Sequence, residues 1–141
     1  MADTARDLMT EGAECIGESE TVAAAAQKLA QLDVGAVPIC GEDDKLKGMI
    51  TDRDIAVKVV AQGKDPQQTT AAELAEGVPT TVTADDPVES VVAVMTENKV
   101  RRVPVLDSDK RLVGIVSQAD IATKADASQA AQVVQAISAA P

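Results

Sequence analysis

Two pairs of a hydroxyl and a carboxyl group stand out in this chain. Thr51 pairs with Asp54 and Ser117 with Asp120, each acid lying three residues after its hydroxyl. This spacing is the capping-box pattern of a helix start, where the cap is worth about 1 kcal/mol and needs no ligand. The same groups can bind a ligand, because the hydroxyl can donate to an anion at a helix start and the carboxylate can accept from hydroxyl groups. The sequence leaves both interpretations open.

The composition excludes much of the usual chemistry of active sites. The chain has no His and no Phe, Tyr or Trp. An imidazole base, a Ser-His-Asp triad, a Cys-His pair and a His-ligated metal are therefore ruled out. Two Cys without His make only half of a zinc site, so we expect no metal. Nothing supplies an activated nucleophile or a tuned acid-base pair, and we expect that the protein is not an enzyme.

The charge of the chain limits its partners. The formal net charge is −10 and the sequence pI is about 4.3. So acidic a chain repels phosphate backbones, and without aromatic side chains it cannot stack on bases, so we expect no nucleic-acid binding. There is no export leader and no apolar run near the roughly 18 residues that a membrane span needs. We therefore predict no membrane association and a cytoplasmic protein.

An internal repeat organises the whole sequence. Val37-Pro38 recurs as Val103-Pro104, Gly48 as Gly114, and Asp54 as Asp120, all at an offset of 66 residues and without gaps. A constant offset over so many residues indicates two copies of one supersecondary unit.

Each copy has the pattern of a short extended piece (15–17 and 81–83), a helix, two short strands and a second helix. Apolar runs at 36–40 and 46–50, and again at 102–106 and 112–116, are separated by turn residues and predict hairpins. Helices are expected at 51–62 and 117–125, after each hairpin, and Asp86 before Pro87 predicts the cap of another helix. An Ala- and Val-rich helix is expected at 130–139.

These elements predict an α/β (α+β) fold made of two β-α-β-β-α repeats. One such unit cannot bury both faces of its sheet, so we expect two units related by a pseudo-twofold axis and packed through their sheets. The predicted domains are repeat 1 at 4–66, repeat 2 at 70–126, and a C-terminal helical extension at 127–141.

The repeated motifs resemble a tandem pair of cystathionine-beta-synthase-type domains, the CBS pair or Bateman module. The resemblance rests on the strands around Pro38 and Pro104 and on Gly48-Met49-Ile50-Thr51-Asp52-Arg53-Asp54-Ile55, repeated as Gly114-Ile115-Val116-Ser117-Gln118-Ala119-Asp120-Ile121. Among stand-alone members the chain is similar to the small actinobacterial hypoxic response protein type, with Val100-Arg101-Arg102-Val103-Pro104-Val105 among the matching residues.

The resemblance implies a regulatory module that binds an adenosine nucleotide in the cleft between its repeats. AMP, ADP, ATP or S-adenosylmethionine would be a regulatory ligand, and no cofactor is required. The carboxylates would hold ribose and the hydroxyls phosphate. A flat wall for adenine would come from Val37, Pro38, Val103 and Pro104. We expect modest affinity, because no aromatic ring stacks on the base.

Arg101 and Arg102 distinguish the two copies. They precede the second repeat's strand, where the family often carries a phosphate-binding cation, whereas the first repeat has Gly35 and Ala36 there. A guanidinium binds phosphate bidentately. The alternative is that these arginines pair with surface acids.

Cys15 and Cys40 lie in the same repeat, and the family fold places their strands near one another. A disulfide would stabilise this half by roughly 3 kcal/mol. Two buried thiols are the alternative, since disulfides are uncommon in the cytosol.

The residues and the resemblance together predict a stand-alone regulatory or sensor protein. The alternative is a structural or stress-response assembly protein that has lost its ligand. Ala-rich helix faces and apolar residues of the C-terminal helix favour a homodimer with twofold symmetry.

Overall fold

The computed structural model describes residues 2–75, 77 and 79–139, and the chain forms two compact units. Unit 1 combines residues 1–13 with 80–141, and unit 2 comprises residues 14–79. Each unit has its own hydrophobic core. The boundaries of the units therefore differ from those of the two sequence repeats, because residues 4–13, the start of the first repeat, fold with the second repeat.

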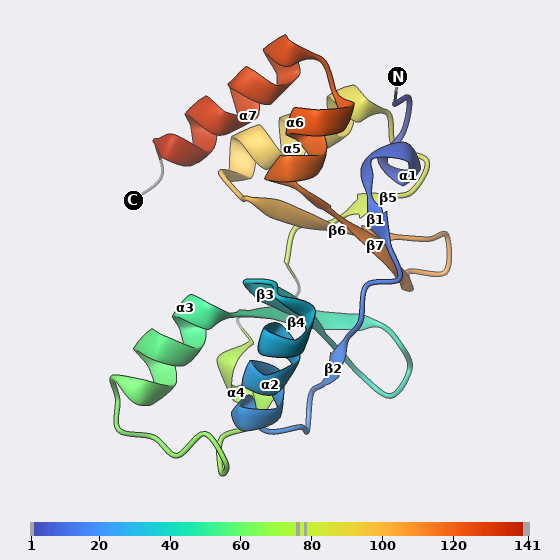
Figure 1. The fold of residues 1–141 in the computed structure, drawn as a ribbon. Helices are drawn as coiled ribbons and strands as arrows, with labels where there is room; N and C mark the ends of the chain where they lie inside the picture. Colours follow the sequence, from blue (N-terminus) through green and yellow to red (C-terminus); the bar gives the residue numbers. More distant parts are fainter. Residues whose placement is uncertain (1, 76, 78, 140–141) are drawn as a thin grey trace. The chain divides into compact units, whose positions relative to one another are not determined.

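Unit 2 carries a mixed sheet with helices on one face (Figure 1). Its elements in chain order are β2 (Ile16–Gly17), α2 (Val22–Leu32), β3 (Ala36–Cys40), β4 (Leu46–Thr51), α3 (Asp52–Asp54), the π-helix η1 (Ile55–Val60) and α4 (Ala71–Leu74). The strand order in the described residues is β2-β3-β4, with β2 parallel and β4 antiparallel to β3. The predicted hairpin of the first repeat is thus confirmed.

Helix α2 illustrates how the sequence directs this unit. The Thr21 hydroxyl caps it by accepting from the backbone N–H of Ala24. Val22, Ala25 and Leu29 recur at the helical period and are buried against the sheet. The helix ends at Asp33, whose φ of 55° is left-handed.

The helix after β4 changes its winding part of the way along. Its first turn, α3, is α-helical, and η1 then follows with bonds such as Ala61 N–H to Ala56 O at 2.9 Å. Such i→i+5 bonds define a π-helix, which is rare and short in proteins. The sequence predicted one helix over 51–62. It did not indicate that the second part of this helix would be a π-helix.

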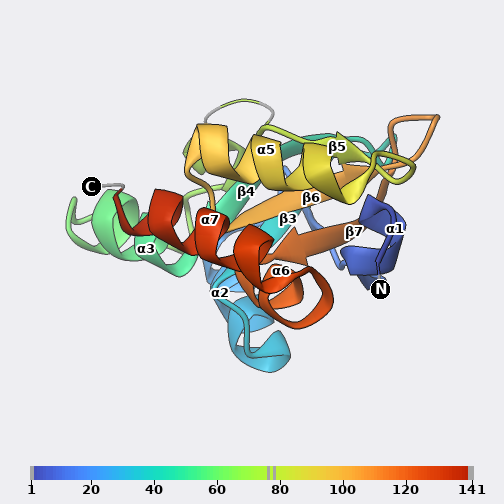
Figure 2. The ribbon, with the colours of Figure 1, turned by 90° about the horizontal axis from the view of Figure 1, so that it is seen from above.

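Unit 1 repeats this plan and adds elements from both chain ends. Its elements are α1 (Ala5–Leu8), β1 (Thr10–Glu11), β5 (Val82–Thr83), α5 (Val88–Asn98), β6 (Arg102–Leu106), β7 (Leu112–Ser117), α6 (Gln118–Lys124) and α7 (Ala127–Ser138). The strand order is β1-β7-β6-β5 in the described residues, with β1 antiparallel to β7. Figure 2 shows α5, α6 and α7 over the strands of this sheet.

The C-terminal helix α7 packs on α5 and α6, on the side away from the sheet (Figure 1). Val133 and Ile137 are buried there, as parts of the core of unit 1. The helix begins at Ala127, earlier than the expected 130, because Asp126 and Gln129 form a capping box. No helix in the described ranges is long and apolar enough to span a membrane.

The predicted cap at Asp86 is wrong. Pro87 itself is the N-cap of α5, with an extended ψ of 155°. The Asp86 carboxylate instead accepts from the backbone N–H of Thr83 at 2.9 Å, closing the turn that leads into the helix. A short polar side chain can serve either role, and local spacing alone does not separate them.

The repeat extends to details of the backbone. The register shifts between Ile39 and Cys40 in one hairpin and between Val105 and Leu106 in the other, at the same repeat position. The N–H of Asp52 donates to Gly35 O at 3.0 Å, and its counterpart in Gln118 donates to Arg101 O at 2.8 Å. The packing of the two units through their sheets stays a prediction.

Candidate functional site

Thr51 and Asp54 form the expected capping box, where β4 passes into α3. The Thr51 hydroxyl accepts from the Asp54 N–H at 3.0 Å, and Asp54 Oδ2 accepts from the Thr51 N–H at 3.1 Å. The second oxygen, Oδ1, lies 3.4 Å from the Nζ of Lys58, one turn further along. The capping interpretation is therefore confirmed, and the box fixes both side chains at the end of the strand.

A pocket of about 310 Å³ opens beside this capping box. It lies within unit 2 and is lined by Met49, Thr51, Asp54, Lys58, Leu74, Gly77 and Pro79. We call it the Asp54 pocket. It combines a carboxylate, a hydroxyl and an ammonium group with apolar walls, which is the composition expected of a small-molecule site.

The far wall of the Asp54 pocket comes from the segment after α4. This segment crosses β4 at Gly48, where an added Cβ would lie 2.8 Å from the Cβ of Ala75 and 3.5 Å from the carbonyl oxygen of Gly77. Gly48 is thus needed for the close approach of a second piece of chain. The sequence singled out this glycine but did not predict that Leu74, Gly77 and Pro79 would complete a site.

Ser117 and Asp120 form the matching capping box in unit 1. Asp120 Oδ2 accepts from the Ser117 N–H at 2.9 Å and from its hydroxyl at 3.0 Å. Lys124 lies 3.5 Å from Oδ1, as Lys58 does in the other unit. Asp120 is buried, whereas Asp54 is partly exposed.

The predicted adenine wall is not at the surface. Val37 and Val103 belong to the two cores, at 1% and 0% exposure. Pro38 and Pro104 are also buried, opposite Met49 and Ile115 in their hairpins. Only Met49 of these neighbours lines the Asp54 pocket, so the structure does not bring the Val-Pro pairs into its wall.

Arg101 and Arg102 lie next to the capping box of unit 1. Arg102 begins β6 opposite Ser117 and is partly buried, while Arg101 is exposed. No ion pair between residues that the structure describes includes either guanidinium. The sequence left open that these arginines pair with acidic side chains at the surface. The described part of the chain does not support this alternative.

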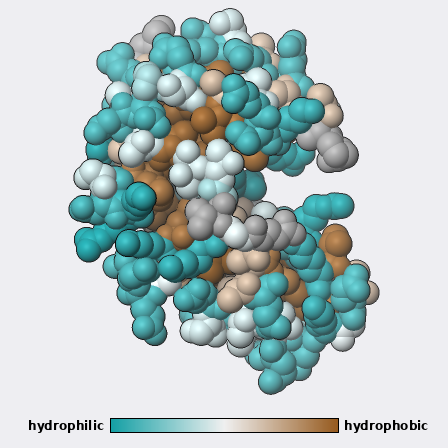
Figure 3. Space-filling view, turned by 180° about the vertical axis from the view of Figure 1, so that it is seen from behind, coloured by the Kyte–Doolittle hydropathy of each residue, from teal (hydrophilic) through white to brown (hydrophobic). Residues whose placement is uncertain are grey.

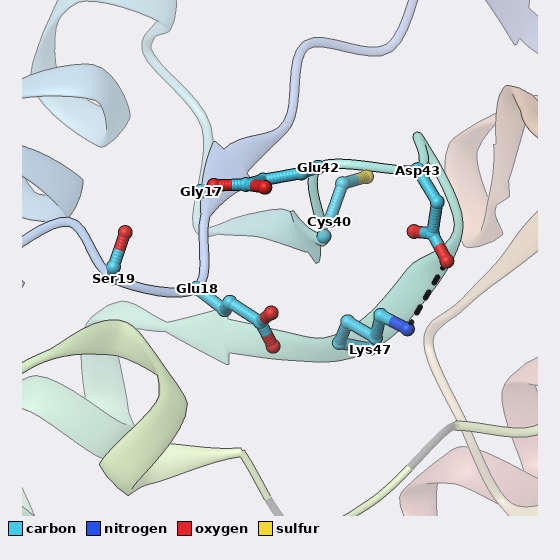
Figure 4. Close-up of a pocket in the computed structure, with 8 residues that line it drawn as sticks. Gly17, Glu18, Ser19, Cys40, Glu42, Asp43 and Lys47 are labelled. Carbon is cyan, nitrogen blue, oxygen red and sulfur yellow. Dashed lines mark ion pairs between the residues drawn. The ribbon is translucent and has the colours of Figure 1, made fainter.

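Cys15 and Cys40 are joined by a disulfide within unit 2. The bond links the residue before β2 to the end of β3, which are already parallel neighbours. Beside it lies a second pocket of about 480 Å³, lined by Gly17, Glu18, Ser19, Cys40, Gly41, Glu42, Asp43 and Lys47 (Figure 4).

This second pocket is dominated by carboxylates. Lys47 is the only cation among the described residues that line it, and its Nζ lies 3.5 Å from Asp43 Oδ2. The pKa of Asp43 is lowered, first by the hydrogen bond from the Lys45 backbone N–H and then by the charge of Lys47. The pocket therefore favours cationic groups over phosphate.

A family model for the CBS domain matches the chain twice, over residues 5–61 and 71–127. The chain belongs to this family and is a tandem CBS-domain protein. Its curated relatives include Hypoxic response protein 1 of Mycobacterium tuberculosis, which is 51% identical over 134 residues, or 95% of this chain and 93% of that protein. Both predictions from the sequence, the tandem CBS domains and the likeness to the hypoxic response protein type, are therefore confirmed.

Solved structures carry the same fold. The crystal structure of Hypoxic Response Protein I with two coordinated zinc ions has a TM-score of 0.80 at 51% identity, covering 87% of this chain and 99% of that one. CBSX2 in complex with AMP has a TM-score of 0.76 at 23% identity, covering 88% and 96%. At that identity the second likeness shows the fold alone.

The residues of this chain do not fit a zinc site. Zinc in proteins is held chiefly by thiolates and imidazoles. This chain has no His, and its two Cys are joined to one another. The described residues contain no group of three or more Cys, Asp or Glu side chains that could hold a metal ion. The described residues of this chain therefore give zinc no site.

Proposed function

We propose that this CBS-domain protein is a regulatory module that binds an adenosine nucleotide in the Asp54 pocket of unit 2. The observation that carries the proposal is the partly exposed carboxylate of Asp54, which is fixed by its capping box and lines a pocket. An acceptor held in this way loses little freedom on binding a ligand, which favours affinity.

Each polar group of the pocket has a part in this proposal. Asp54 accepts from the ribose hydroxyls. The Thr51 hydroxyl and the ammonium group of Lys58 face the phosphate, and Met49, Leu74 and Pro79 contact the base. Lys58 must exchange some of its attraction to Asp54, 3.4 Å away, for the phosphate. With no aromatic ring to stack and a net charge of −10, the affinity is modest and falls with added salt.

The proposed role is regulatory and not catalytic. Among its described lining residues the Asp54 pocket contains neither an imidazole nor a thiol, and Asp54 is the carboxylate that these residues place beside Thr51. Binding therefore acts by stabilising one state of the protein, which a partner or a second copy would read.

A panel of AMP, ADP, ATP and S-adenosylmethionine tests the proposal. A ligand that binds only the folded protein raises its melting temperature by mass action. Unfolding must be followed by circular dichroism, because the chain has no aromatic residue. No shift with any of the four would favour the ligand-free assembly protein.

The phosphate contact from Arg101 or Arg102 stays a prediction, tested in the same assay. Arg101→Ala and Arg102→Ala leave both capping boxes intact. If a guanidinium binds the phosphate, one of these two variants should bind the charged nucleotides about tenfold more weakly than the parent does. The same variant should lose much less affinity for adenosine, which has no phosphate. Unchanged affinity in both variants would assign the phosphate to the pocket's own groups.

We also propose that the protein is a homodimer. The support is a set of exposed large apolar side chains in unit 2, namely Leu32, Val34, Val57 and Val60. Figure 3 shows apolar surface between hydrophilic side chains on the face seen there. Burying such side chains against a second copy would remove them from water.

A further inference from the structure

The two sulfur atoms of the disulfide lie in different surroundings. Cys15 precedes β2 and is partly exposed, whereas Cys40 ends β3 and is 5% exposed. Both residues belong to unit 2. The charges around each sulfur become important once the bond is reduced, because the reactive form of a thiol is its thiolate.

An ammonium group lies beside Cys15. The Nζ of Lys28, on α2, donates to the carbonyl oxygen of Cys15 at 3.2 Å, although the two residues are 13 positions apart in the chain. A cation held against the same residue favours the thiolate over the thiol. The neighbouring Glu14 is exposed, so water screens its carboxylate. Cys15 is therefore placed to react as a thiolate that solvent can reach.

Cys40 has the opposite charge around it. It lines the pocket of about 480 Å³ together with Glu18, Glu42 and Asp43 (Figure 4). The ammonium group of Lys47 lies 3.5 Å from Asp43, which offsets its charge. Burial and neighbouring carboxylates both disfavour a thiolate. Cys40 is therefore placed to stay a neutral thiol.

The fold holds the two residues together without the disulfide. β2 and β3 are parallel neighbours with Gly17 opposite Cys40, and the N–H of Glu18 donates to the carbonyl oxygen of Cys40 at 3.2 Å. The Cα atoms of Cys15 and Cys40 are 5.6 Å apart, which is inside the usual range for a disulfide. A reduced pair can thus close again with little movement of the backbone.

We infer that Cys15 and Cys40 form an oxidant-reactive pair, in which Cys15 reacts with a hydroperoxide and Cys40 resolves the product. The Cys15 thiolate attacks one oxygen of the hydroperoxide, and the O–O bond breaks. The leaving alkoxide, or hydroxide from hydrogen peroxide, takes a proton from the solvent, and Cys15 becomes a sulfenic acid. The sulfur of Cys40 then attacks that of Cys15, the S–O bond breaks, and hydroxide leaves with the thiol proton as water.

The pair acts once for each oxidation and is not a catalyst by itself. The two thiols lose two electrons and two protons, and the hydroperoxide becomes an alcohol, or water, and a further water. An external thiol reduces the disulfide and resets the pair. The disulfide in unit 2 is the oxidised product of this reaction.

Limited alkylation of the reduced parent tests which thiol reacts first. Trypsin cleaves after Lys28 and so separates Cys15 from Cys40, and mass spectrometry then measures the iodoacetamide label on each. At pH 7 we expect Cys15 to be labelled at least about tenfold faster than Cys40. Equal rates, or faster labelling of Cys40, would overturn the inference. An unfolded circular dichroism spectrum after reduction would overturn it too, because this arrangement of charges exists only in the folded protein.

Variants of Lys28 separate the effect of charge from that of exposure. Lys28→Gln should slow the labelling of Cys15 about threefold or more, and Lys28→Arg should restore it. Lys64→Gln, which removes an exposed ammonium group in the same unit, is the control and should have no effect. An unchanged rate in Lys28→Gln would contradict the role of Lys28, because exposure alone would then set the reactivity of Cys15.

Hydrogen peroxide tests the reaction itself. Reduced Cys40→Ser should accumulate a sulfenic acid on Cys15, which dimedone traps, and reduced Cys15→Ser should be trapped at least about tenfold more slowly. In the reduced parent, one peroxide per chain should remove both titratable thiols. Trapping at equal rates in the two variants, both folded by circular dichroism, would refute the assigned roles. If either variant is unfolded, the labelling of the reduced parent is the deciding measurement.

Discussion

Glu73 shows what a capping carboxylate does for this fold. It closes the capping box of α4 by accepting from the Thr70 N–H. This hydrogen bond, followed by one from the Thr70 hydroxyl, lowers the pKa of Glu73 from its ordinary value of 4.5. The folded protein therefore binds this proton less tightly than the unfolded chain does. The stabilisation is complete above pH 4.5 and is lost as the pH falls through the lowered value.

We predict that Glu73→Gln reduces the loss of stability in acid. The variant lacks the carboxyl group that titrates, so its free energy of unfolding should fall less between about pH 5 and about pH 3. Denaturant unfolding followed by circular dichroism at each pH measures this. Glu97→Gln, which removes an exposed carboxyl group on α5, is the control. Equal slopes for Glu73→Gln and the parent would contradict the prediction.

Single residues predicted the caps better than the site. Thr51 and Ser117 cap helices because hydroxyl and acid stand at the right spacing, which is local information. The pocket beside Asp54 depends on Leu74, Gly77 and Pro79, which come from a distant segment. Leu74 matches Leu8 at the repeat offset, which marks it as a repeated position of the sequence. That Leu74 lines a pocket beside Asp54 follows only from the fold.

At the level of elements, hairpins were predicted well and β1 was missed. The strand Ala36–Cys40 has the bounds expected from its apolar run. β1 is two exposed residues whose partner lies more than a hundred residues away in β7. Its pairing is a tertiary event, and neither propensity nor alternation in Thr10-Glu11 indicates it.

Helix α7 should stabilise unit 1 through one face only. Ile137 is 7% exposed and Val134 is 39% exposed. We predict that Ile137→Ala lowers the free energy of unfolding by about 2 kcal/mol, through lost burial and a cavity. Val134→Ala, on the other face, should cost less than about 0.5 kcal/mol. Denaturant titration distinguishes them, and equal costs would mean that α7 is not docked.

The disulfide should stabilise unit 2 through the chain between its ends. Cys15 and Cys40 are 25 residues apart, a loop whose closure is worth about 3 kcal/mol in the chain-entropy model. We predict that a dithiol reductant lowers the melting temperature, and that the parent has no titratable thiol when unfolded without reductant. The double variant Cys15→Ala/Cys40→Ala should not respond to reductant. Two free thiols in the parent would refute the bond.

For the whole molecule, the proposed dimer has a direct test. One chain is 14.5 kDa, so light scattering should give twice that mass at tens of micromolar. Val60→Glu places a charge on a side chain that is 66% exposed and should shift the protein towards monomer. Gln62→Glu, with the same charge change two residues later, should not. A monomer mass for the parent would rule out the homodimer.

The membership of residues 1–13 in unit 1 has a consequence for how the protein is made. Unit 2 is continuous and can complete its core as soon as residues 14–79 have left the ribosome. The segment carrying Leu8 and Met9 emerges earlier but packs against residues between Val82 and Ile137, which are translated after unit 2. During synthesis it therefore waits with its apolar side chains uncovered, across a loop of about a hundred residues whose closure costs entropy. Leu8 and Met9 are thus translated before unit 2 but are among the last residues of the two units to be buried.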